Sequence, residues 1–207
     1  MRNTGTFTLA TPRGDARVSV DSPPGQTNGV AILFHGAGGT MNAPVLVAAR
    51  DALLGIGWRV VRLDQPYVVA GRRAPAPAAH LDEVALLTVE EVRGEGEPLL
   101  LAGKSSGARV TCRTARAAGA LGCVAYGFPL HPPGRPEKTR APELNAAGVP
   151  VLVCQGVRDA FGTPDDVKAA AKRGVKVSEV PGDHSMRTKA AIEAAVALTV
   201  RWVQART

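Results

Sequence analysis

Aromatic residues are scarce in this chain of 207 residues and make up only 4% of it. Proteins that bind single-stranded nucleic acids stack the bases on aromatic rings, and this chain offers few such rings. The formal net charge is +7, but the basic residues are scattered and no nucleic-acid-binding motif accompanies them. We therefore expect no nucleic-acid partner and interpret the charge as a solvated basic surface, which leaves an anionic substrate open.

Cysteine is also scarce, with Cys112, Cys123 and Cys154 as the three present and no CxxC spacing among them. Each lies within the apolar pattern of a predicted helix or strand, which favours reduced core thiols over disulfides or zinc ligands. The four histidines are dispersed and lack the HxxxH spacing of metal sites. The sequence therefore predicts no metal site.

No apolar run is long enough to span a membrane, and residues 1–15 are polar and interrupted by glycine and proline, unlike a secretion signal. We therefore expect a soluble, cytoplasmic protein with no membrane attachment. The content of 45% apolar and 21% charged residues is typical of a globular chain. Its length fits one domain, which we place at residues 1–207.

What the sequence does contain is a strand signal that runs directly into a GxSxG motif. Leu99 to Ala102 are four apolar residues, too few for a helix, and the motif at 103–107 follows them at once, with a helix-compatible segment after it. A serine on a sharp turn between a buried strand and a helix projects its hydroxyl above the sheet, and the flanking glycines remove side chains that would clash. Ser105 is therefore the candidate nucleophile.

A second glycine-rich turn, at residues 35–40, follows another apolar strand signal at 29–34. Such a turn can bring a backbone N–H close to a substrate oxygen, and the residue after the nucleophile can supply a second N–H. We expect Ala37 and Ser106 to provide these two donors of an oxyanion hole.

Both glycine-rich segments also resemble nucleotide-binding motifs. Gly103-Lys104-Ser105 matches the end of a P-loop, but the first glycine of that motif would fall on Pro98. The turn at 35–40 partly matches a dinucleotide-binding fingerprint with Asp64 as a ribose ligand, but Met41 occupies the last glycine position. We rank nucleotide binding well behind, and expect no cofactor.

The remaining candidates follow late strand signals. Asp159 lies just after an apolar strand and is our choice for the acid that orients a histidine, and His184 in the last loop is the expected general base. Asp165 and Asp166 are placed to stabilise a helix N-terminus. Asp183 is adjacent to His184, and neighbouring side chains usually diverge, so it competes poorly with Asp159.

Strand and helix signals alternate along the chain, which predicts an α/β fold with a doubly wound, mostly parallel sheet flanked by helices. Alternating residues around 6–20 predict an antiparallel hairpin at one edge. A helix is expected at 78–93, and another closes the chain with an apolar stripe of Ile192, Val196, Val200 and Val203. No insertion between the predicted strands is long enough to form a large cap.

The order Ser105, Asp159, His184, together with the elbow and the glycine turn, resembles the α/β-hydrolase superfamily over nearly the whole chain. The loop Pro129-Leu130-His131-Pro132-Pro133-Gly134 is similar to that of a small lidless group related to dienelactone hydrolases. Those enzymes use cysteine where this chain has serine, so their substrate is not carried over.

The resemblance implies a serine esterase or thioesterase with a Ser-His-Asp catalytic triad, acting on a small or exposed acyl substrate. We expect five further residues to line its site: His35, Phe128, Leu130, His131 and Phe161. The alternative is a non-catalytic interaction module that kept the hydrolase fold. The sequence does not indicate an oligomeric state or a particular substrate.

Overall fold

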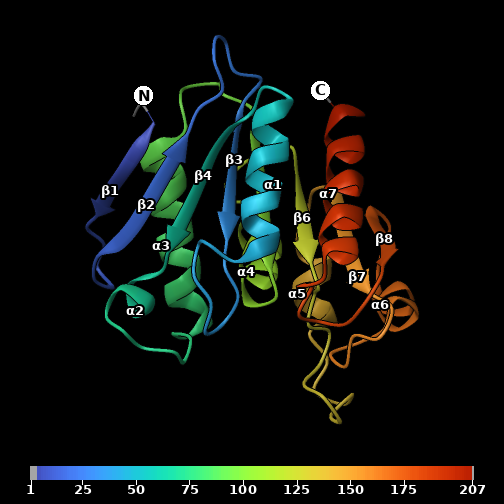
Figure 1. The fold of residues 1–207 in the computed structure, drawn as a ribbon. Helices are drawn as coiled ribbons and strands as arrows, with labels where there is room; N and C mark the ends of the chain where they lie inside the picture. The colour runs from blue at the N-terminus through green and yellow to red at the C-terminus, as the bar shows by residue number, and fades with distance from the viewer. Residues whose placement is uncertain (1–3, 207) are drawn as a thin grey trace.

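In the computed structural model, residues 4–206 are described, and their centre is an eight-stranded sheet (Figure 1). The strand order is β1-β2-β4-β3-β5-β6-β7-β8. The first two strands form an antiparallel hairpin, β2 pairs antiparallel with β4, and every other pairing is parallel. The strand bounds are β1 Gly5–Leu9, β2 Ala16–Asp21, β3 Val30–Phe34, β4 Arg59–Asp64, β5 Leu99–Lys104, β6 Gly122–Tyr126, β7 Val151–Gly156 and β8 Val175–Val180.

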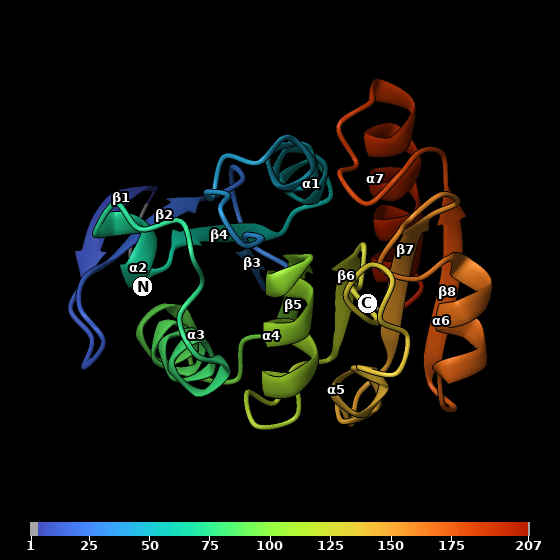
Figure 2. The same ribbon diagram turned by 90° about the horizontal axis from the view of Figure 1, so that it is seen from below.

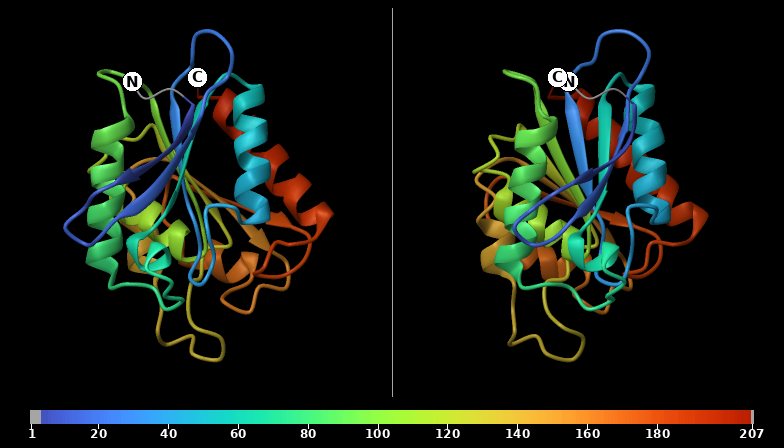
Figure 3. Two further views of the ribbon diagram at one scale, coloured as in Figure 1. Left: turned by 60° about the vertical axis from the view of Figure 1, so that its left-hand side comes forward. Right: turned by 90° about the vertical axis from the view of Figure 1, so that its left-hand side faces the viewer.

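Helices cover both faces of the sheet, as Figures 2 and 3 show. On one face lie α1 (Pro44–Gly55) and α7 (Lys189–Gln204). On the other lie α3 (Ala78–Val92), α4 (Ser106–Thr114), α5 (Ala141–Asn145) and α6 (Pro164–Ala170). The predicted doubly wound α/β architecture without a large cap is therefore confirmed. Two of the helices are short, α5 and α2 (Pro66–Val69).

The central strands are apolar because both of their faces are covered. In β5, Leu99 and Leu101 face the α3/α4 side, whereas Leu100 and Ala102 face the α1/α7 side, and all four are at most 2% exposed. Each fully buried leucine contributes about 1.5–3 kcal/mol relative to an exposed one. Continuous apolar runs therefore fix these strands in the middle of the sheet.

The parallel register brings the carboxyl ends of β3, β5, β6 and β7 to one edge of the sheet. Phe34 pairs with Gly103, Lys104 with Tyr126, and Tyr126 with Cys154. Loops that follow these strands consequently meet at this edge, which Figure 2 views from below. This is where open α/β sheets build their sites.

The buried face of α7 differs from the predicted apolar stripe. The buried side of α7 consists of Ala191, Ala195, Thr199, Trp202 and Val203, whereas Ile192 and Val196 are only half-buried. Small alanines allow the helix to lie close to the sheet, and Thr199 is hydrogen-bonded to the hydroxyl of Tyr126 at 3.0 Å. All three cysteines are buried and free. Among residues 4–206, no helix is long and apolar enough to cross a membrane.

Candidate active site

The turn between β5 and α4 holds Ser105 in a strained conformation, with φ 52° and ψ −109°. A non-glycine residue with positive φ costs about 1–3 kcal/mol and persists only where its surroundings hold it. Here the glycines on either side permit close packing. A Cβ on Gly103 would lie 2.3 Å from the backbone of Gly107, and a Cβ on Gly107 would lie 2.2 Å from the carbonyl oxygen of Phe34. The serine is thus raised above the strand ends as the motif predicts.

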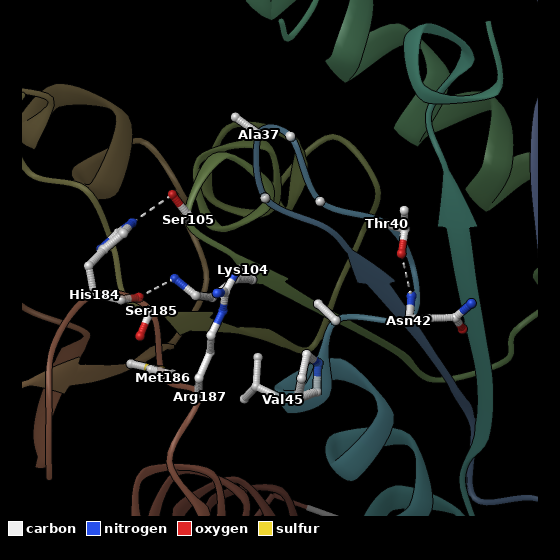
Figure 4. A pocket seen from close by; sticks show the side chains of 15 residues that line it. Ala37, Thr40, Asn42, Val45, Lys104, Ser105, His184, Ser185, Met186 and Arg187 are labelled. Atoms are coloured by element: carbon white, nitrogen blue, oxygen red, sulfur yellow. Dashed lines mark hydrogen bonds between the residues drawn. The ribbon is translucent and has the colours of Figure 1, made fainter. Parts of the chain in front are cut away.

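Ser105, His184 and Asp159 form one hydrogen-bonded chain. His184 Nδ1 lies 2.8 Å from Asp159 Oδ2. Figure 4 shows the second link, in which His184 Nε2 lies 2.8 Å from Ser105 Oγ. An ionised carboxylate only accepts, so Nδ1–H donates to Asp159. In the neutral ring, Nε2 then accepts the hydroxyl proton of Ser105. The structure therefore brings together the three side chains that the sequence singled out.

Asp159 is 2% exposed and fully hydrogen-bonded. Besides His184, Oδ2 accepts from Gln155 Nε2 at 2.9 Å, and Oδ1 accepts from the backbone N–H of Phe161 at 2.8 Å. Gln155 is itself held, because its side chain bonds the backbone N–H and C=O of Phe128. A polar residue within an otherwise apolar strand was the available signal for Gln155, and our sequence reasoning passed over it.

The loop that carries His184 is tied to the elbow by Lys104. Its Nζ donates to the backbone carbonyl of His184 at 2.5 Å, and Lys104 is only 8% exposed. Burial lowers the pKa of Lys104 to about 8, although Asp159 and Asp183 oppose the change. On the other side of the imidazole, the ring of Phe161 lies 4.2 Å from that of His184, centre to centre. The backbone of His184 and one face of its imidazole ring are thus both held in place.

The glycine turn after β3 presents Ala37 at the surface beside Ser105 (Figure 4). Ser106 is the first residue of α4, so its N–H has no partner within the helix. The turn is anchored by His35, which is 4% exposed, donates from Nδ1 to the carbonyl of Gly36 and accepts at Nε2 from the N–H of Gln65. Burial lowers the pKa of His35, so the imidazole is held neutral.

Comparison with family models places residues 27–203 in the alpha/beta hydrolase domain family. The chain belongs to the alpha/beta hydrolase family. A comparison with curated proteins finds no significant match.

Solved structures with the same fold include a serine hydrolase without a lid from Xanthomonas campestris, which is 25% identical, with a TM-score of 0.78 over 97% of this chain and 94% of that one. A serine hydrolase homologue from Coxiella burnetii is 22% identical, with a TM-score of 0.80 over 98% and 99% of the two chains. The esterase domain of a Rhodothermus marinus protein is 13% identical, with a TM-score of 0.73 over 99% of each.

In this hydrolase an open cleft of about 460 Å³ adjoins Ser105. The glycine turn and the start of α1 form one wall, and Lys104 with the loop after β8 forms the other. The residues that line it are Gly36, Ala37, Gly38, Gly39, Thr40, Asn42, Ala43, Pro44, Val45, Lys104, Ser105, His184, Ser185, Met186 and Arg187. Among residues 4–206, no group of three or more His, Cys, Asp or Glu side chains is placed to hold a metal ion.

The prediction of substrate-lining residues was wrong for His35, Phe128 and Leu130. All three are buried, Phe128 completely, because the chain turns back into the core after β6 and Phe128 packs there. Phe161 contacts His184 but does not line the cleft, and neither does His131, whose Nδ1 lies 3.0 Å from the carbonyl of Pro132.

Proposed function

We propose that this protein is a serine hydrolase that cleaves ester-like acyl bonds, of the carboxylesterase or thioesterase type. The observation that carries the proposal is the hydrogen-bonded chain Ser105–His184–Asp159 on a strained elbow, with 2.8 Å at both links. Geometry and roles, rather than sequence position, identify such a triad. Membership of the alpha/beta hydrolase family supports the same conclusion.

In the proposed reaction, Ser105 Oγ attacks the acyl carbonyl while His184 Nε2 takes its proton. The tetrahedral intermediate collapses to an acyl-serine when His184 returns that proton to the leaving oxygen or sulfur. Water then attacks the acyl-serine with His184 again as base, which releases the acid and restores Ser105. Asp159 keeps the imidazole in the required tautomer and stabilises the cation that forms.

The oxyanion would accept hydrogen bonds from the N–H groups of Ala37 and Ser106. Ala37 lines the cleft beside Ser105, and Ser106 directly follows Ser105 as the first residue of α4. Removal of one such donor typically slows the reaction by about a hundredfold to a thousandfold. The elbow must be rigid for this purpose, and the contacts at Gly103 and Gly107 provide that rigidity.

Two observations support an ester or thioester that is reached from solvent. The cleft is open at the strand ends, and no cap formed by residues 4–206 covers it. The similar fold of an esterase domain from Rhodothermus marinus is in keeping with this substrate class.

A fluorophosphonate probe tests the proposal directly. We expect the wild type to be labelled at Ser105, as located by mass spectrometry, and Ser105→Ala to remain unlabelled. Ser185→Ala removes another serine of the cleft and should retain the label. A folded wild type that is neither labelled nor active on 4-nitrophenyl acetate would overturn the proposal in favour of a non-catalytic interaction module.

A further inference from the structure

The cleft beside Ser105 has an unbalanced charge. Among the described residues that line it, Lys104 and Arg187 are the strong bases, and none is aspartate or glutamate. The nearest carboxylates already have partners. Asp159 is bonded to His184, and Asp183 accepts from both the N–H and the hydroxyl of Ser185. Among residues 4–206, Asp159 and Asp183 act on the charge of Lys104 from outside the cleft lining, and no carboxylate forms an ion pair with Arg187.

Arg187 is the base that is free to bind. It is exposed and has no hydrogen bond or ion pair to any other residue in the range 4–206, whereas Lys104 donates to the carbonyl of His184. Figure 4 shows the Arg187 side chain extending from its loop toward Lys104 along the cleft wall. Without a partner, its guanidinium offers the paired N–H groups that match a carboxylate or phosphate.

The backbone holds Arg187 in this place. The preceding residue, Met186, has a positive φ of 47° and is only 1% exposed. A left-handed methionine is unusual and indicates that its surroundings impose the conformation. Because the Met186 side chain is packed in the core on the α1/α7 side, the chain emerges at Arg187 directly over the cleft.

The two cations also disfavour each other. Burial is the main cause of the lowered pKa of Lys104, and the positive charge of Arg187 lowers it further. An anion bound at Arg187 would offset this repulsion. A cleft lined by charges of one sign attracts ligands of the opposite sign.

We propose that the substrate of this site carries an anionic group, a carboxylate or a phosphate, and that Arg187 is the specificity-determining residue that binds it. The inference rests on the proposed function for its catalytic consequence, but the binding of the anion does not require turnover.

Matched esters test the proposal. Mono-4-nitrophenyl glutarate and 4-nitrophenyl pentanoate have acyl chains of equal length with and without a terminal carboxylate. Butyryl esters of 4-hydroxybenzoate and 4-hydroxybenzamide place the charge on the leaving group instead. For one of the two pairs, we expect kcat/KM for the charged ester to exceed that for the neutral one by about tenfold, which corresponds to one charged hydrogen-bond pair. Arg187→Gln should abolish this ratio, and added salt should reduce it.

Arg201→Gln is the matched control, because it removes one exposed arginine of α7 outside the cleft and should leave the ratio unchanged. A second measurement is independent of catalysis: glutarate binding to the Ser105→Ala variant by calorimetry, which should weaken by about tenfold when Arg187→Gln is added. Equal kcat/KM values for the charged and the neutral esters, together with no glutarate binding, would overturn the anion site and leave the proposed function standing. Glutarate binding that depends on Arg187 without any ester cleavage would support the anion site and count against the proposed function.

Discussion

We expect Lys104 to lower the stability of the folded protein and to support its activity. The substitution Lys104→Met allows these two effects to be measured separately. Lys104 is 8% exposed, and burial lowers its pKa from 10.5 to about 8. That change corresponds to about 3 kcal/mol by which the charge destabilises the folded state at pH 7. Methionine has no charge to bury, but it leaves the carbonyl of His184 without its donor, which costs about 1–3 kcal/mol. At pH 7 the variant should therefore be as stable as the wild type, or up to about 2 kcal/mol more stable.

The pH dependence sharpens this expectation. Between pH 8 and 10.5 the unfolded chain binds more protons at Lys104 than the folded chain does, so wild-type stability rises with pH through this window. Lys104→Met lacks this rise. Between pH 7 and pH 10.5, the free energy of unfolding of the wild type should thus rise by up to about 3 kcal/mol relative to that of the variant. The variant should become the less stable of the two.

Urea unfolding at several pH values measures the difference, with Lys138→Met as a control at an exposed lysine. Hydrolysis of a neutral ester should fall by about tenfold to a hundredfold in Lys104→Met, because the loop of His184 loses its tether to the elbow. A variant that is more than 2 kcal/mol less stable at pH 7, or a stability difference that does not change with pH, would refute the reasoning.

Three further substitutions or conditions have expected outcomes. Gly107→Ala places a Cβ 2.2 Å from a β3 carbonyl oxygen and should lower the free energy of unfolding by at least about 2 kcal/mol, measured in urea. Glu97→Gln removes the charge that faces the 3%-exposed Arg59 at 2.6 Å and should cost about 3 kcal/mol; a loss below 1 kcal/mol would contradict it. The lowered pKa of His35 means that the unfolded chain binds its proton first, so stability should fall as pH drops below 6.5, and His35→Gln should show less of this fall in unfolding titrations.

The central sheet was predictable because burial on both faces demands continuous apolar runs. Val30–Phe34 and Leu99–Ala102 contain no polar residue, and this pattern is specific for a covered strand. Short helices are different, since α2 has four residues and α5 has five. Such segments contain at most one or two helical turns, too few to show a period, and tertiary packing rather than propensity decides them.

The face of α7 shows a second limit. Large apolar side chains at 192, 196 and 200 predict one stripe, but the helix buries Ala191 and Ala195 instead. Periodicity gives the existence of an amphipathic helix, whereas its rotation depends on how closely the sheet allows it to approach. Phe128 illustrates the same point in a loop, because only the path of the chain after β6 shows that the ring faces the core.

At the candidate site, the GxSxG motif and the positions just after predicted strands were enough to single out Ser105, Asp159 and His184, and their catalytic roles stay a prediction. The residues that hold them were missed because each is a polar or charged residue in a buried strand, and its hydrogen-bond partners lie in other segments of the chain. Gln155 is a polar residue in a buried strand, and Lys104 is a charged residue at the end of another. A polar or charged residue in a buried strand shortly before a proposed nucleophile or acid indicates a partner in another segment, since an unpaired polar group buried there would be too costly to keep.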